Sequence, residues 1–144
     1  MKPEHFEDAL EEPRIIAAIQ AEEARTSGEI RVFVSSAEPA DILAEARREF
    51  RRLGMTRTPL RNGVLLYFAP KIRKFAVIGD EGIHSRCGEA FWTAVAGDLE
   101  SRLKSGQFQE AVLSAVARAG AELARHFPKH PGDRNDLPDG IARD

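Results

Sequence analysis

Several classes of protein are excluded by what this sequence has little of. One cysteine among 144 residues excludes an intrachain disulfide framework and a cysteine-rich zinc module, because both need several cysteines. The 21 basic and 23 acidic residues give a formal net charge of −2, so no overall charge attracts nucleic acid or an anionic membrane. The longest notable apolar run, residues 64–69, is far shorter than the ~20 residues that span a bilayer. We expect no nucleic-acid partner and no membrane insertion.

The length of the chain fits one domain with its own hydrophobic core. We expect a single domain over residues 1–127, followed by a tail over residues 128–144. Proline and glycine recur in that tail and argue against regular structure there: Pro128, Pro131, Gly132 and Pro138. The first thirteen residues are acidic, where a signal peptide carries basic residues and then an apolar stretch, which predicts a cytoplasmic protein.

The periodicity of apolar residues predicts both helices and strands. Apolar residues at helical spacing indicate helices over about residues 13–25, 41–53, 91–103 and 108–127, with a short helical stretch ahead of the first. Residues 29–34 alternate between polar and apolar, which is typical of a strand, and residues 64–68 form a continuous apolar run that fits a strand buried on both faces. Residues 74–78 indicate the returning arm of a hairpin.

This order of elements predicts an α/β fold with a small mixed sheet. The first strand, the helix after it and the second strand form a βαβ unit, so these two strands run parallel, and the hairpin makes the third strand antiparallel to the second. The first two strands therefore begin, and the third ends, at the same edge of the sheet. Residues near that edge include Glu22, Glu29, Asn62, Asp80 and Arg61.

Carboxylate and amide oxygens that converge on loops suit a hard cation such as Ca²⁺, which takes six to eight oxygen ligands in flexible geometry. Glu29 is the strongest candidate ligand because it begins a strand, where the pleat fixes the direction of its side chain. Asp80, which follows Gly79, comes second. Ordinary solvated loop acids are the alternative interpretation, because such residues are common at loops and helix ends.

Other motifs are weaker. His126 and His130 are four residues apart, but Pro128 breaks the helix that a zinc-binding pair would need. His84 and Cys87 supply only two ligands, which is too few for a metal site. Residues 79–82 lack the spacing of a phosphate-binding loop and open no immediate helix at the C-terminal edge of a parallel strand. Trp92 and the phenylalanines of the last two helices fall at core spacing.

A set of ordered motifs resembles the TPM domain family. The motifs are AE at 21–22, TSGEIRV at 26–32, RNGVLLY at 61–67, RK at 73–74, IGD at 78–80, GI at 82–83, GQF at 106–108, HFP at 126–128 and NDLP at 135–138. The last two are typical of its soluble bacterial branch, and the resemblance covers about residues 13–139. It implies a three-layer α/β/α sandwich that binds a divalent cation, chiefly Ca²⁺, and weak acid phosphatase activity is associated with plant members.

By the same resemblance, the ligands of the cation are Glu29, Asp80, Asn62 and Glu22, with Mg²⁺ or another divalent cation as alternatives to Ca²⁺. Three functions follow as hypotheses. The first is a cation-binding module, and the second is a slow metal-assisted phosphomonoesterase in which Arg61 neutralises phosphate and an activated water or Asp80 attacks it. The third is an interaction domain that acts on a membrane-bound or protein partner, in which any cation only stabilises the loops. The sequence lacks a complete set of nucleophile, base and orienting group, which favours binding over catalysis.

Overall fold

The computed structural model describes residues 3–130 and 137–144, which form five α-helices around a sheet of four strands. The helices are α1 (Pro3–Ala9), α2 (Glu12–Glu23), α3 (Ile42–Arg52), α4 (Glu81–Lys104) and α5 (Phe108–His126). The strands are β1 (Glu29–Val34), β2 (Gly63–Ala69), β3 (Lys74–Gly79) and β4 (Ala142–Arg143). Two single-turn 3₁₀ helices, η1 (Met55–Arg57) and η2 (Pro70–Ile72), lie in the connections.

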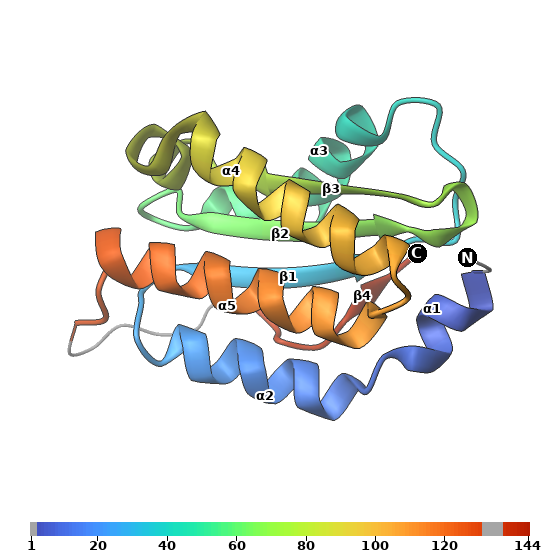
Figure 1. Ribbon diagram of the computed structural model, residues 1–144. Helices are drawn as coiled ribbons and strands as arrows, with labels where there is room; N and C mark the ends of the chain where they lie inside the picture. The colour runs from blue at the N-terminus through green and yellow to red at the C-terminus, as the bar shows by residue number, and fades with distance from the viewer. Residues whose placement is uncertain (1–2, 131–136) are drawn as a thin grey trace.

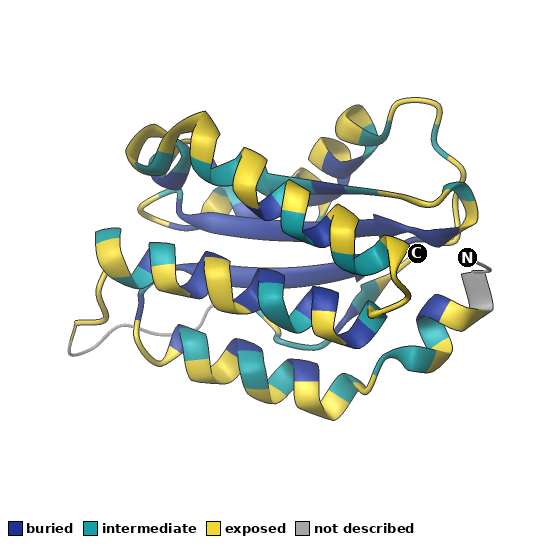
Figure 2. Cartoon of the chain, viewed as in Figure 1, coloured by how far each residue is buried: buried dark blue, intermediate teal, exposed yellow. Residues whose placement is uncertain are grey.

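The sheet has the strand order β3-β2-β1-β4. β1 and β2 are parallel and joined through α3, and β2 and β3 form an antiparallel hairpin, so the predicted βαβ unit and hairpin are confirmed. Every residue of β2 is buried, as the continuous apolar run predicts for a central strand. Figure 2 shows the buried strands between layers of partly exposed helices.

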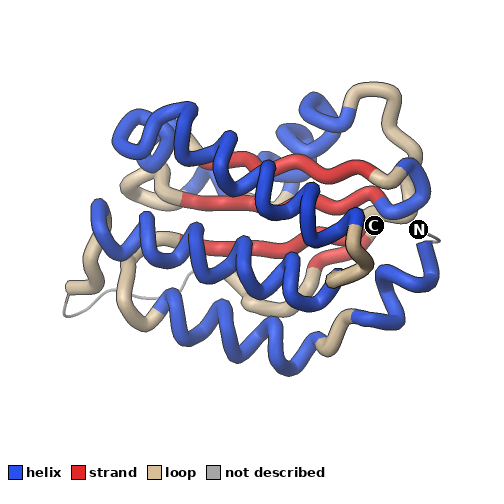
Figure 3. Tube along the Cα trace, viewed as in Figure 1, coloured by secondary structure: helices blue, strands red, loops and turns tan. Residues whose placement is uncertain are grey.

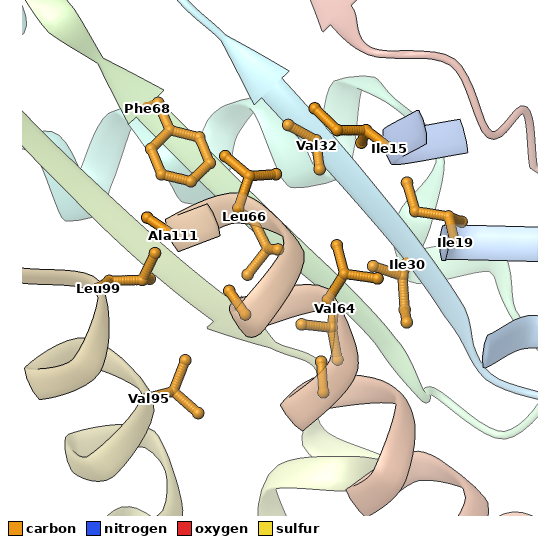
Figure 4. Packing of buried hydrophobic residues seen from close by; sticks show 14 of the residues in the cluster. Ile15, Ile19, Ile30, Val32, Val64, Leu66, Phe68, Val95, Leu99 and Ala111 are labelled. Carbon is orange, nitrogen blue, oxygen red and sulfur yellow. The ribbon is translucent and has the colours of Figure 1, made fainter. Parts of the chain in front are cut away.

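Helices cover both faces of this sheet, which gives the predicted three-layer α/β/α sandwich. Figure 1 shows α2, α4 and α5 side by side on one face and α3 behind the sheet on the other. The larger core lies under the first group, where Ile30, Val32 and Leu66 of the sheet meet Ile15 and Ile19 of α2 (Figure 4). Burial of these apolar side chains away from water supplies the main stabilising free energy of the fold.

A smaller core lies on the α3 face. Phe33 and Tyr67 stack with ring centroids 5.3 Å apart, and Phe50 of α3 and Met55 pack in the same cluster. Asp41 caps the N-terminus of α3, where its carboxylate accepts a hydrogen bond from the N–H of Ala44 at 3.1 Å. These contacts hold the βαβ crossover against the sheet.

α4 begins earlier than the sequence indicates. The helix expected over about residues 91–103 begins at Glu81, directly after the antiparallel strand β3, because the Asp80 carboxylate caps the N–H of Glu81 at 2.8 Å. The first turns of α4 end in a kink at Gly88, whose φ of 74° is open to glycine without strain. Gly82 and Gly88 both disfavour a helix, so the sequence pattern of this segment does not indicate one.

The C-terminal segment of residues 137–144 is also more ordered than the sequence indicates. The expectation of no regular structure in the tail is wrong at β4, which pairs parallel to β1 through Phe33 and Ala142 (Figure 3). Ile141 is buried, and Arg143 forms ion pairs with Glu7 and Glu12 at 3.2 Å each. This short strand covers part of an edge of β1 that would otherwise expose its backbone groups. Residues 131–136 of the tail lie outside the described residues.

Candidate functional site

The predicted convergence of loops at one edge of the sheet is confirmed. The strand register pairs Glu29 with Gly63 and Val64 with Gly79, so β1 and β2 begin where β3 ends. The Asp80 N–H donates to the carbonyl of Gly63 at 2.9 Å, which ties the start of α4 to the start of β2. This edge lies at the left in Figure 1. Glu29 is therefore the first residue of β1, Asn62 directly precedes β2, and Asp80 directly follows β3.

Asp80 is buried, with 7% of its surface exposed, and its carboxylate is fully engaged by cationic and backbone donors. Arg61 Nε donates to Oδ2 at 2.7 Å and Arg61 Nη2 donates to Oδ1 at 2.9 Å, in the two-point geometry that makes arginine–carboxylate pairs strong. The hydrogen bonds to Asp80 raise the pKa of Arg61. A cation at Asp80 must therefore compete with Arg61.

Asn62 is locked in the buried connection just before β2. Its side-chain amide Nδ2 donates to Ser27 Oγ at 3.3 Å, and its backbone N–H donates to Thr58 Oγ1 at 3.2 Å. Its backbone carbonyl accepts from the N–H of Glu29 at 3.4 Å. Asn62 thus joins the loops that precede β1 and β2.

Glu22 lies on the last turn of α2 and holds Arg25 in an ion pair. Its side chain also lies directly over Gly120 of α5, where a Cβ atom would collide with it. Glu22 is thus occupied between α2 and α5, whereas the next residue, Glu23, faces β1.

Glu23 was not among the ligands predicted from the sequence, yet it is the most perturbed acid of this edge. Only 5% of its surface is exposed, and its Oε2 accepts from the N–H of Ile30 at 2.8 Å. Burial raises the pKa of Glu23 to about 10, with further contributions from a hydrogen bond to Asp139 and from the negative charge of Glu29. The Ile30 N–H opposes this rise. The raised pKa therefore favours the neutral form of the Glu23 carboxyl at neutral pH.

Arg31 supplies positive charge to the same buried region. It lies two residues after Glu29 and therefore on the same face of β1, and its Nη2 donates to the carbonyl of Gly140 at 3.3 Å. Burial lowers the pKa of Arg31, and the charges of Asp139, Glu23 and Glu29 oppose that decrease. The polar and apolar alternation of β1 suggests an exposed polar face. The structure instead buries Glu29 and Arg31, with 3% and 7% of their surfaces exposed.

We use the term "carboxyl cluster" for Glu23, Glu29 and Asp139, which all interact with Arg31. Asp139 belongs to the C-terminal segment, which sequence periodicity does not place near β1. The pairing of β4 with the far end of β1 is what brings this segment back across the strand. Within residues 3–130 and 137–144, no three His, Cys, Asp or Glu side chains have an arrangement that could hold a metal ion as it stands.

The weaker sequence motifs have structural roles here. His84 Nδ1 accepts from Trp92 Nε1 at 2.9 Å, which links the two parts of α4 across its kink. Burial raises the pKa of the Cys87 thiol, so this cysteine is a poor nucleophile at neutral pH. His126 faces Glu122 of its own helix at 3.8 Å.

The fold is an α/β/α sandwich with a mixed sheet, and the loops at one edge of that sheet converge. The sequence model of the TPM domain matches residues 4–122, so the chain belongs to the TPM domain family. Among solved structures, the chain is similar to the NMR structure of the BA42 protein from the psychrophilic bacterium Bizionia argentinensis. The two chains are 34% identical, each is covered over 92% of its length, and the TM-score is 0.85. A search of curated proteins found no match.

The helices give no indication of a membrane-spanning segment. Among the helices of the described part of the chain, none is both long enough and apolar enough to cross a bilayer.

Proposed function

We propose that this protein is a divalent-cation-binding module, with Ca²⁺ as the first candidate and Mg²⁺ or another divalent cation as alternatives, and that Glu29 is the central ligand. The observation that carries the proposal is the carboxyl cluster: Glu23, Glu29 and Asp139 gather at the buried start of β1, around one arginine, Arg31. Because the raised pKa of Glu23 favours its neutral form, the negative charges here are those of Glu29 and Asp139, which still exceed the one positive charge of Arg31. A divalent cation would compensate the excess.

The chemistry of these groups supports a hard cation. Ca²⁺ takes six to eight oxygen ligands and tolerates mixtures of carboxylate, carbonyl and water oxygens, which suits a site that combines side chains from α2, β1 and the C-terminal segment. Glu23 and Glu29 come from well-ordered elements that fix their backbones. Cation binding in this proposal requires the Glu23 carboxyl to lose its proton, so that its oxygens become available as ligands beside those of Glu29 and Asp139.

The other predicted ligands have supporting positions in this proposal. Asn62 adjoins Glu29 through its backbone carbonyl and orders the loop next to the cluster. Asp80 and Glu22 each hold an arginine, Arg61 and Arg25, so each of them joins the cation only where that arginine gives way. We therefore expect Glu29 to contribute more to cation affinity than Asp80 or Glu22.

Isothermal titration calorimetry of EDTA-treated protein with CaCl₂ and MgCl₂ tests the proposal. We expect saturable binding of Ca²⁺, and we expect Glu29→Gln to weaken it about tenfold or more, because it removes a charged ligand of similar shape. Glu38→Gln is the matched control, since Glu38 is exposed in the loop after β1, at the opposite edge of the sheet. Absence of binding by the parent protein, or equal affinity in Glu29→Gln, would contradict the proposal.

A binding role fits this edge better than a catalytic one. A weak metal-assisted phosphomonoesterase requires Arg61 for the phosphate and Asp80 or a water for the attack, but Asp80 holds Arg61 through two hydrogen bonds. We therefore propose an accessory role, in which the bound cation orders the edge of the sheet for a protein partner. Loss of a pulled-down partner in EDTA, with recovery in excess Ca²⁺, is the expected result. Retention of the same partner in EDTA would contradict a cation-dependent role.

A further inference from the structure

A separate groove lies at the opposite end of the sheet from the carboxyl cluster. It has a volume of about 650 Å³ and is formed by α1, the hairpin turn between β2 and β3, the end of α4 and the start of α5. In Figure 1 these elements meet at the right, near α1. Pockets of roughly 300–1,000 Å³ are the size that encloses small organic ligands. None of the cation ligands discussed above lines this groove.

The floor of the groove is aromatic. Phe6 is central, with its ring centroid 5.2 Å from that of Phe68 and 5.7 Å from that of Phe108. Phe6 and Phe68 are buried, whereas Phe75 and Phe108 are half-buried and present apolar surface to the groove. This floor accepts a flat or alkyl group, because aromatic faces pack closely with either.

The mouth of the groove is positively charged. Arg73, Lys74 and Lys104 line it and are exposed, and Glu100, which also lines it, forms an ion pair with Lys104 at 2.9 Å. Among the described lining residues, cationic side chains thus outnumber anionic ones beside an apolar floor. This combination complements a ligand that is apolar at one end and anionic at the other.

The backbone at the mouth is strained. Arg73 has a φ of 54°, in the left-handed region that side chains other than glycine seldom adopt. Such strain recurs at ligand-binding turns, where the surrounding fold holds a residue in place for function. Arg73 follows η2 in the hairpin turn that lines the groove.

We propose that this groove binds a small amphipathic anion, whose apolar body lies on Phe75 and Phe108, over the buried Phe6, and whose carboxylate faces Arg73 and Lys74. The inference is independent of cation binding at Glu29, because it concerns other residues at the opposite end of the sheet. Long-range attraction by the three cations aids the approach of the ligand, and the aromatic floor provides the larger part of the affinity.

Two probes that share the naphthalene ring system but differ in charge test this proposal. The first is 2-naphthoate, and the second is the neutral 2-naphthalenemethanol, each titrated into ¹⁵N-labelled protein and followed by amide chemical shifts. We expect both to shift amides around residues 68–75 and 103–108, with 2-naphthoate binding several-fold more tightly. Shifts that are absent or spread over the whole chain, or equal affinity for the two probes, would overturn the proposal.

Two variants separate the contributions of charge and apolar surface. Lys74→Glu is expected to lower the affinity for 2-naphthoate about threefold to tenfold, because an exposed charge contributes modestly. The affinity for 2-naphthalenemethanol is expected to stay unchanged. The control is Lys129→Glu, the same charge reversal at an exposed position beyond α5, which is expected to change neither affinity. Phe75→Leu is expected to weaken both probes. If Lys74→Glu and Lys129→Glu changed the affinity for 2-naphthoate equally, the assignment of Lys74 to the mouth of the groove would be contradicted.

A second copy of the chain is the alternative occupant of the groove. To distinguish self-association from ligand binding, the same amide shifts are measured without a probe over a wide range of protein concentration. The proposal requires these shifts to stay constant. Concentration-dependent shifts at residues 68–75 and 103–108 would assign the groove to self-association and overturn the small-molecule proposal.

Discussion

Arg61 and Asp80 join the start of β2 to the start of α4 by two hydrogen bonds, of 2.7 and 2.9 Å, between guanidinium and carboxylate. The backbone strengthens the same link, since the carbonyl of Arg61 accepts from the N–H of Gly82 at 2.8 Å. Arg61 adopts a φ of 52°, a conformation that costs free energy in a residue with a side chain. The contacts with α4 compensate for that cost. This edge of the sheet is thus held by a particular pair of side chains.

The first prediction concerns this ion pair. Asp80→Asn is expected to lower the free energy of unfolding by about 1–2 kcal/mol, because asparagine preserves the N-cap but loses the charged partner of Arg61. The value is at the low end for charged hydrogen bonds because Arg61 is 40% exposed and screened by water. Urea denaturation at neutral pH measures the change.

Asp41→Asn provides the matched control, since Asp41 also caps a helix but forms its cap at an exposed position. We expect a change of only a few tenths of a kcal/mol there, because aspartate and asparagine are similar N-caps. Equal losses of stability in the two variants would show that Asp80 acts as a cap alone.

The second prediction compares two glycines of α4. A Cβ atom at Gly82 would lie 2.1 Å from the carbonyl oxygen of Leu60 and 2.5 Å from that of Arg61, so Gly82→Ala must push α4 away from the preceding loop. We expect it to lower the free energy of unfolding by about 2 kcal/mol or more. Gly97→Ala meets no atom within 4 Å and is expected to raise it by about 0.5–1 kcal/mol, the helix propensity of alanine over glycine. Thermal and urea unfolding of both variants measure these opposite changes in the free energy of unfolding.

The third prediction is the pH dependence of stability in the metal-free protein. The pKa of Glu23 rises from 4.5 to about 10 on folding, because burial, Asp139 and Glu29 disfavour its charged form, while the Ile30 N–H opposes the rise. Arg31 also faces this group, and its positive charge favours ionisation. Between the two pKa values the folded state binds a proton that the unfolded state has released. The free energy of unfolding therefore falls as pH rises through this window, by at most about 1.4 kcal/mol per pH unit.

Urea denaturation in EDTA, from about pH 5 to about pH 9, measures this slope. Glu23→Gln keeps the hydrogen bond to Ile30 and does not titrate, so it is expected to flatten the profile. Glu38→Gln, in an exposed loop, is expected to retain the slope of the parent protein. A slope in Glu23→Gln equal to that of the parent would assign the pH dependence to another group.

Most of the fold could be predicted from the sequence, because its signals are local and repeated. The continuous apolar run of β2 and the capping of α3 by Asp41 indicate those elements without tertiary information. β4 has two residues, too few for any periodicity, and its partner Phe33 lies more than a hundred residues earlier in the chain. The start of α4 is also concealed, since Gly82 and Gly88 reduce helix propensity.

The candidate site could be predicted only in part. Topology brings Glu29, Asn62 and Asp80 to one edge, as strand order alone indicates. Glu23 could have been found from its place on the last turn of α2, next to the predicted strand, but its hydrogen bond with Asp139 of the C-terminal segment could not. Asp139 and the pairing of Arg61 with Asp80 depend on three-dimensional contacts that no spacing in the sequence specifies.

Thermal unfolding of EDTA-treated protein, repeated with excess Ca²⁺ and with excess Mg²⁺, tests the central claim of a cation site at Glu29 most directly. A cation at ~100 times its dissociation constant stabilises the folded state by about 2.7 kcal/mol, which corresponds to a rise in Tm of roughly 5–10 °C for a chain of this length. We predict such a rise with Ca²⁺ for the parent protein and for Glu38→Gln, and its loss in Glu29→Gln. An unchanged Tm in the parent protein, or an equal rise in Glu29→Gln, would contradict the claim.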